Sequence, residues 1–141
     1  MKTDPSALHQ IAYLSRATAP FGTTQLLVLL AGSRQRNAER GITGLLLCGN
    51  DQFFQVLEGE ASLVRQLYAR ICHDPRHREI ITLADQAIEQ RRFANWSMRH
   101  QSLPAQPFIE FAGYATQASQ QPDAAQTDAQ LHRLLAQVLA A

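Results

Sequence analysis

Apolar and polar residues alternate in a short stretch near the middle of the chain, Phe53-Phe54-Gln55-Val56-Leu57-Glu58. Side chains of a β-strand point to opposite faces with a period of two, so this alternation predicts a strand. Gln55 then shares one face with Phe53 and Leu57, and the other three residues share the opposite face. A buried amide without a partner costs about 1–3 kcal/mol. We therefore expect a hydrogen-bonding partner for Gln55, either a nearby side chain or, on an edge strand, the backbone.

The same pattern along the rest of the chain predicts five strands and two helices before residue 103. The strands are predicted at residues 8–15, 42–48, 52–58, 79–84 and 96–101, and the helices at 23–40 and 61–73. A turn signal, Gly49-Asn50-Asp51, predicts a hairpin between the second and third strands. The order βαββαββ predicts a ferredoxin-like α+β fold. We expect a mostly antiparallel five-stranded sheet with both helices on one face.

Each predicted helix has one apolar side. Leu26, Leu29, Leu30 and Ser33 share a side of the first helix, and steps of three or four residues continue it to Arg36 and Asn37. Gly41 suits the position after this helix, where a positive φ is often required. The apolar side of the second helix is formed by Val64, Leu67, Tyr68 and Ile71. The first helix therefore ends in hydrogen-bonding groups beside an apolar surface.

The composition changes after residue 103, where prolines punctuate a segment rich in alanine and glutamine. Helical spacing of apolar residues predicts helices at 107–116, with Phe108 and Phe111 inward, and at 127–140. A ferredoxin-like sheet leaves one face bare, so this extension is expected to cover it or to form a subunit or partner surface. We divide the chain into a domain at 1–103 and a C-terminal helical extension at 104–141.

Composition and charge exclude several classes of function. A chain of 141 residues with 45% hydrophobic residues, 18% charged residues and a net charge of +1 fits one globular domain without a nucleic-acid or membrane partner. Cys48 and Cys72 lie in apolar surroundings, without zinc-ligand spacing, and indicate a reduced, cytoplasmic protein. Residues 1–6 lack the apolar run of a signal peptide.

The candidate chemistry is that of binding. The sequence holds no glycine-rich phosphate loop, no metal-ligand cluster and no recognisable nucleophile. Tyr13, Asn37, Gln55, Trp96 and Met98 could together hold a flat polar ligand. Each of them alone is more typical of an ordinary core residue than of a cofactor site.

Five segments in this chain carry a family resemblance. They are Tyr13-Leu14-Ser15-Arg16, Asn37 with Gly41-Ile42-Thr43-Gly44-Leu45-Leu46, Phe53 to Gly59, Asp74-Pro75-Arg76-His77, and Arg92-Phe93-Ala94-Asn95-Trp96-Ser97-Met98. In this order and spacing they resemble the BLUF domain, a family of blue-light receptors that bind FAD without a covalent bond. The resemblance runs from about residue 8 to residue 100 and agrees with the predicted fold.

The resemblance implies a role for each matching position. Tyr13 would give an electron and then a proton to the excited flavin, and Gln55 would bridge Tyr13 and the flavin. Trp96 and Met98 match strand residues that exchange places beside the glutamine. The residues expected around the cofactor are Tyr13, Leu29, Ser33, Arg36, Asn37, Gln55, Arg70, Ile71, Asp74, Arg76 and His77. Arg36 departs from the family pattern, since many relatives carry asparagine or histidine there.

We therefore expect a blue-light photoreceptor that binds FAD and is not an enzyme. Its output would pass to a signalling protein in trans or through a homo-oligomer. Two alternatives remain open, a light-independent flavin-binding module or small flavoenzyme, and a flavin-free ferredoxin-like regulatory or interaction domain.

Overall fold

The computed structural model describes residues 7–19, 35–91, 93–94, 99–102 and 105–119. Within these ranges the elements are β1 (Leu8–Ala17), β2 (Thr43–Gly49), β3 (Gln52–Glu60), α2 (Ala61–Cys72), β4 (His77–Ala87), β5 (Arg99–Ser102) and α3 (Ala105–Ser119). Residues 35–40 are helical and lead into β2. Among the described residues, no helix has the length and apolar character needed to cross a membrane.

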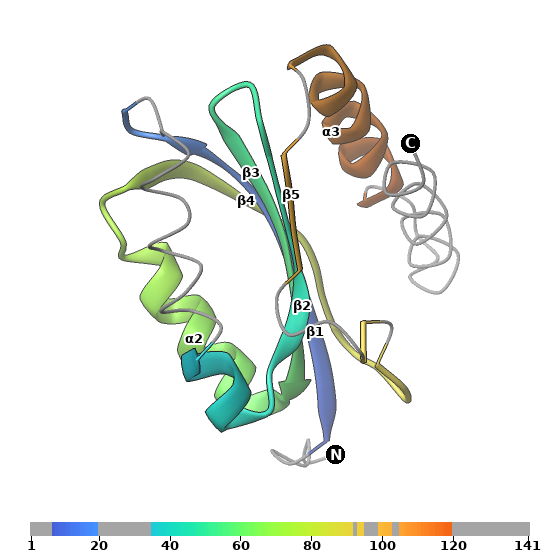
Figure 1. Cartoon of the computed structure of the whole chain (residues 1–141). Coiled ribbons are helices and arrows are strands. Elements are labelled where there is room, and N and C mark those ends of the chain that lie inside the picture. The colour runs from blue at the N-terminus through green and yellow to red at the C-terminus, as the bar shows by residue number, and fades with distance from the viewer. Residues whose placement is uncertain (1–6, 20–34, 92, 95–98, 103–104, 120–141) are drawn as a thin grey trace.

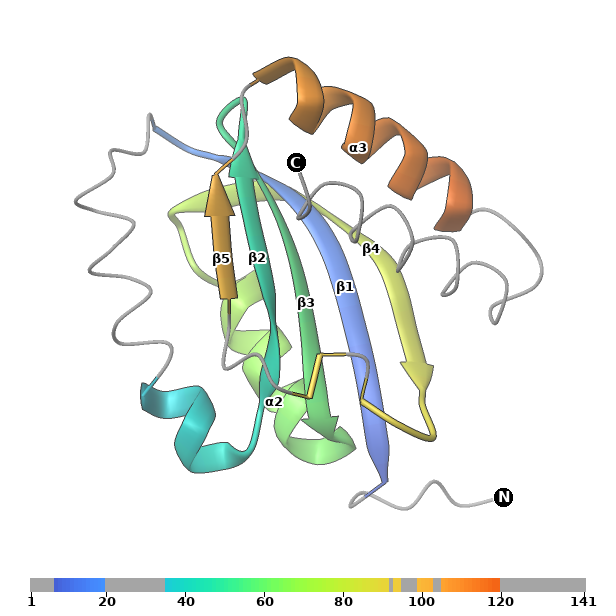
Figure 2. The same cartoon turned by 45° about the vertical axis from the view of Figure 1, so that its right-hand side comes forward.

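The strands form one sheet in the order β4-β1-β3-β2-β5. Neighbouring strands are antiparallel except β2 and β5, which run parallel. The helix α2 covers one face of the sheet, and α3 lies over the other (Figures 1 and 2). The predicted α+β class with an antiparallel sheet is confirmed, and the helix at residues 105–119 covers the face that the sequence predicted to be bare.

The hairpin between β2 and β3 turns through Asn50 and Asp51, which have φ angles of 52° and 55°. A two-residue turn with positive φ at both positions matches the right-handed twist of the strands that it joins, and asparagine and aspartate tolerate it well. Gly41, with φ 67°, follows the helical residues 35–40 and leads the chain into β2. Both turns lie where the sequence predicted them.

The sheet separates two apolar clusters. The cluster under α2 contains Ile11, Ile42, Leu46, Cys48, Phe53, Leu57 and Val64, with Leu63, Leu67, Tyr68 and Ile71 packed against it. The cluster under α3 contains Ala12, Leu14, Leu45, Leu47, Phe54, Val56, Leu83, Phe93, Phe108 and Phe111. Consecutive leucines of β2 therefore enter opposite clusters, as strand alternation predicts.

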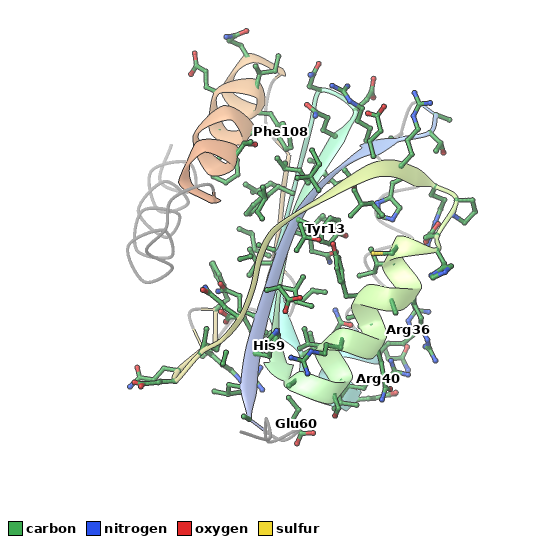
Figure 3. All side chains as sticks on the ribbon, turned by 180° about the vertical axis from the view of Figure 1, so that it is seen from behind. His9, Tyr13, Arg36, Arg40, Glu60 and Phe108 are labelled. Carbon is green, nitrogen blue, oxygen red and sulfur yellow. The ribbon has the colours of Figure 1, made fainter. Side chains whose placement is uncertain are left out.

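The helix α3 is held to the sheet by two phenylalanines. Phe108 is fully buried and Phe111 is 2% exposed. The ring of Phe111 meets Phe54 of β3 edge-on, with centroids 4.9 Å apart and an interplanar angle of 81°. Phe108 lies between α3 and the sheet in Figure 3. The prediction that these two side chains point inward is confirmed.

The prediction for β4 was wrong in length, because the strand runs from His77 to Ala87 rather than over residues 79–84. Among the described strands, β4 lies at the edge of the sheet and pairs only with β1. Most of its side chains reach solvent, so its sequence lacks a clear apolar period. Glu79 has a φ of 54°, close to an irregularity in the pairing with β1. Of the strand predicted at 96–101 the structure describes residues 99–101, which lie in β5. The predicted helix at 127–140 and most of the one at 23–40 lie outside the described residues.

Candidate functional site

A phenol and a primary amide meet on the α2 face of the sheet. Tyr13 of β1 lies directly opposite Gln55 of β3 in the antiparallel register, and both are buried, with exposures of 4% and 8%. The Tyr13 hydroxyl donates a hydrogen bond to Gln55 Oε1. Figure 3 shows Tyr13 on the side of the sheet that faces α2. The partner that the alternating pattern required for Gln55 is therefore the side chain of Tyr13.

A second tyrosine stands beside this pair. The ring of Tyr68, from α2, lies 5.5 Å from the ring of Tyr13 and is tilted by 41°. Its hydroxyl shares a 2.5 Å hydrogen bond with Thr82 Oγ1 of β4. Burial raises the pKa of both phenols above the ordinary value of 10.0, and at Tyr13 the neighbouring Tyr68 adds to the effect. Both side chains are therefore neutral near pH 7.

His77 connects the C-terminal end of α2 to β1. Its Nε2 lies 2.5 Å from the carbonyl oxygen of Ile71, and its Nδ1 lies 2.8 Å from Ser15 Oγ. A carbonyl can only accept, so Nε2 carries the proton, and in the neutral imidazole Nδ1 accepts from the Ser15 hydroxyl. The imidazole also lies 6.0 Å from the ring of Tyr13. Both nitrogens of His77 thus have protein partners at the edge of the site.

Asp74 and Arg76 form a bidentate ion pair just beyond α2. Arg76 Nε lies 2.9 Å and 3.0 Å from the two carboxylate oxygens, and a terminal nitrogen lies 2.5 Å from Oδ2. The backbone N–H of Arg76 also donates to Oδ1 at 2.9 Å. These bonds lower the pKa of Asp74 and raise that of Arg76. The pair therefore remains ionised near pH 7 and holds the loop that leads into β4.

The remaining predicted site residues differ in burial. Asn37 is 3% exposed although it is polar. Ile71 is half-buried against the α2 cluster. Arg36 and Arg70 are exposed. Leu29, Ser33, Trp96 and Met98 lie outside the described residues.

The donor set fits a flat heteroaromatic ligand with carbonyl and N–H groups. Tyr13 and Gln55 supply a phenol and an amide among the apolar side chains of Leu46, Phe53 and Ile71. Ligand sites of this kind combine apolar walls with a few fixed polar groups. Among the described residues, no group of three or more histidine, cysteine, aspartate or glutamate side chains could hold a metal ion. We name this arrangement of a phenol and an amide the Tyr13–Gln55 site.

Sequence reasoning placed Tyr68 only in the apolar side of α2 and missed its contact with Tyr13. It also passed over Ser15, which bonds His77. Two features of the sequence could have indicated these contacts. Tyr68 lies three residues before Ile71 on the same side of the helix, and Ser15 lies two residues after Tyr13 on the same strand face.

Comparison with known proteins agrees with this geometry. Residues 8–99 match the family model described as BLUF, sensors of blue-light using FAD. The chain is 36% identical over 97 residues to the photoactivated adenylate cyclase subunit beta of Euglena longa. That match covers 68% of this chain and 11% of the relative, so the chain spans about a tenth of the length of this curated relative.

Solved structures give the same result. A dark-state structure of BlrB, a BLUF protein, superimposes with a TM-score of 0.72 and 32% identity, covering 96% of this chain and 99% of that one. A bacterial light-regulated adenylyl cyclase superimposes with a TM-score of 0.67 and 25% identity, covering 94% of this chain and 34% of that one. From the match over residues 8–99 and the likeness to BlrB along its whole length, this chain belongs to the BLUF family of blue-light sensors that use FAD.

Proposed function

We propose that this chain is a blue-light photoreceptor that binds FAD without a covalent bond at the Tyr13–Gln55 site. One observation carries the proposal, the buried hydrogen bond from the Tyr13 hydroxyl to Gln55 Oε1. A phenol is readily oxidised, and an amide has both a donor and an acceptor end. The pair therefore combines an electron donor with a side chain that can reverse its hydrogen bonds.

When bound and excited by blue light, the flavin supplies a strong oxidant next to these two side chains. Tyr13 would give an electron to the flavin and then pass its phenolic proton on through Gln55, and both would return to Tyr13 afterwards. Gln55 would relay the proton in each direction, so it keeps the same number of protons and ends rotated or as its tautomer. The hydrogen bonds that Gln55 offers its neighbours differ between the two states, and the absorption shifts to the red. These two arrangements form a bistable element.

The surrounding residues would bind and orient the ring. Asn37 would hydrogen-bond its pyrimidine end, and Ile71 would pack against its face together with Leu29. The Asp74–Arg76 pair, His77, Arg70, Arg36 and Ser33 would surround the ring or its ribityl chain, and Trp96 and Met98 would pass the change at Gln55 outwards. The burial of Asn37 and the half-burial of Ile71 support the first two roles.

The output would pass to another molecule and not to an enzyme activity of residues 1–141. The likeness to the BLUF protein BlrB, 99% of whose solved chain is covered, supports output from residues 1–141 to another molecule. The photoactivated adenylate cyclase, of which the chain spans about a tenth, illustrates the other arrangement. We therefore propose a signalling protein in trans, or a change in homo-oligomer, as the recipient of the signal.

Absorption spectroscopy of four variants tests the assignment. Gln55→Leu should keep the flavin and lose the reversible red shift, and Tyr13→Phe should abolish the ordinary photocycle. Two matched controls should photocycle normally. Gln66→Leu makes the same change at an exposed position of α2, and Tyr68→Phe removes a hydroxyl that bonds Thr82. A normal photocycle in Gln55→Leu would refute the role of Gln55.

The same preparations separate the alternatives. Flavin colour without a reversible shift in the unaltered protein would indicate a light-independent flavin-binding module. Colourless protein that stays colourless after incubation with FAD would indicate a flavin-free regulatory domain. Chromatography of the flavin released by heat distinguishes FAD from FMN.

A further inference from the structure

A row of polar side chains crosses the sheet on the face opposite the Tyr13–Gln55 site. In the strand registers Gln10 of β1 lies opposite both Gln86 of β4 and Glu58 of β3, and Glu58 lies opposite Thr43 of β2. Glu58 is fully buried and Gln10 is 1% exposed. Burying a polar side chain this deeply costs folding free energy unless it is hydrogen-bonded. The hydrogen bonds within the row therefore decide whether these residues stabilise or destabilise the fold.

The hydrogen bonds of the row converge on the carboxylate of Glu58. Gln86 Nε2 donates to Gln10 Oε1 at 3.0 Å, and Gln10 Nε2 donates to Glu58 Oε2 at 2.8 Å. The other carboxylate oxygen, Oε1, accepts from the backbone N–H of Phe93 at 2.8 Å. Both oxygens of Glu58 are thus engaged, one by the sheet and one by the segment that joins β4 to β5.

A second contact attaches the same segment to β3 at the same residue. Arg91 donates from Nη1 to the carbonyl oxygen of Glu58 at 3.1 Å and to Thr43 Oγ1 at 3.0 Å. Phe93 is 4% exposed and belongs to the cluster under α3. Figure 2 shows the chain after β4 crossing the sheet on the side that carries α3, in front of β1 and β3. Glu58 therefore anchors this crossing segment through both its side chain and its backbone.

We propose that Glu58 is a positioning residue of the photoreceptor, which couples β3 to the segment before β5; this inference rests on the proposed function. Gln55 precedes Glu58 by three residues on β3 and points to the opposite face, so movement of this strand at Gln55 displaces the acceptor of the Phe93 N–H. Trp96 and Met98, the expected signal residues, follow Phe93 by three and five residues. The carboxylate fixes Phe93, the buried residue that precedes them in the chain.

Two substitutions of Glu58 differ in the hydrogen bonds that they can keep. Glu58→Gln can keep every bond, because its oxygen accepts from Phe93 and its NH2 donates to Gln10 once the amides of Gln10 and Gln86 turn over. Glu58→Met has a similar volume and removes both acceptors. A matched control is Glu89→Met, which makes the same change at an exposed position of the joining segment.

The experiment measures two quantities in the flavin-loaded full chain, the exchange rate of the Phe93 amide in the dark and the rate of dark recovery after blue light. In Glu58→Met we expect exchange of the Phe93 amide to be up to about tenfold faster, because its N–H loses the Glu58 Oε1 acceptor. We also expect dark recovery to be several-fold faster. Glu58→Gln and Glu89→Met should stay within about twofold of the unaltered protein on both.

A wild-type recovery rate in Glu58→Met overturns the inference even if its Phe93 amide exchanges quickly, since Glu58 would then serve the fold alone. If Glu58→Met does not fold, Arg91→Met tests the attachment of the same segment to Glu58, at a half-buried residue. A wild-type recovery rate in Arg91→Met would then overturn the inference. Failure of the proposed function is a separate result, the lack of any reversible red shift in the unaltered protein.

Discussion

The hydrogen bond between Tyr13 and Gln55 can be measured by a double-mutant cycle of Tyr13→Phe and Gln55→Leu. Both side chains are more than nine-tenths buried, and the hydroxyl of one donates to the amide oxygen of the other. Tyr13→Phe removes only a hydroxyl. Gln55→Leu keeps a side chain of similar size but removes the acceptor of the phenol. The two single changes therefore break the same bond from opposite ends.

The expected free energies follow from what each change leaves buried. Loss of one ordinary hydrogen bond costs about 0.5–1.5 kcal/mol, so Tyr13→Phe should destabilise the protein by about 1 kcal/mol. Gln55→Leu leaves the phenolic hydroxyl without this acceptor in the interior and should cost about 1–3 kcal/mol. In the double variant that hydroxyl is gone, so adding Tyr13→Phe to Gln55→Leu should recover about 1 kcal/mol.

Urea unfolding of the flavin-free proteins measures the change in the free energy of unfolding for the two single variants and the double variant. Ligand binding does not contribute to these values. If the hydrogen bond is present, Tyr13→Phe should destabilise the unaltered protein but stabilise the Gln55→Leu variant. Strictly additive costs would refute the contact between the two side chains. As a control, Tyr68→Phe combined with Gln55→Leu should be additive, because Tyr68 bonds Thr82 instead.

Three further predictions concern the two clusters and the loop after α2. Phe54→Ala truncates a fully buried ring that packs against Phe111 and should lower the free energy of unfolding by about 3–5 kcal/mol in urea titrations. Burial raises the pKa of the Cys48 thiol from 9.0 to about 12. The stability from the neutral thiol is therefore full below pH 9 and falls by about 1.4 kcal/mol per pH unit up to pH 12. Cys48→Ala should remove that part of the alkaline slope. The Arg76 guanidinium lowers the pKa of Asp74 from its ordinary 3.8, so this pair stabilises the fold above that pH and its contribution is lost as the pH falls through the lower folded pKa. Arg76→Met should move the carboxyl titration of Asp74 upwards in an NMR pH series, and an unchanged titration would contradict the ion pair.

The arrangement of β3 could be predicted from its sequence because both of its faces are buried. With a period of two, a strand sandwiched between α2 and α3 must divide its side chains between two clusters, and Gln55 and Phe54 fall on the predicted sides. The turn at Asn50 and Asp51 was equally predictable, since few other residues adopt two successive positive φ angles.

The features that sequence reasoning missed depend on packing between distant segments. β4 is an edge strand whose side chains mostly reach solvent, so no apolar period marks its ends. The contact of Tyr68 with Tyr13 depends on how α2 crosses the sheet, which helical spacing alone does not fix. An acidic residue at the end of an apolar strand usually indicates the approach to solvent, whereas Glu58 is fully buried because Gln10 and Phe93 supply its donors. The roles expected of Trp96 and Met98 stay predictions, as they lie outside the described residues.

In the proposed photoreceptor, light rearranges the hydrogen bonds at the Tyr13–Gln55 site without changing the covalent structure of the flavin. The most direct measurement is the absorption spectrum of the purified, flavin-loaded chain in the dark, after a pulse of blue light and after return to darkness. We predict a flavin spectrum that moves to the red and then returns fully. A flavin spectrum that does not move, or that bleaches to reduced flavin without the red-shifted form, would contradict it.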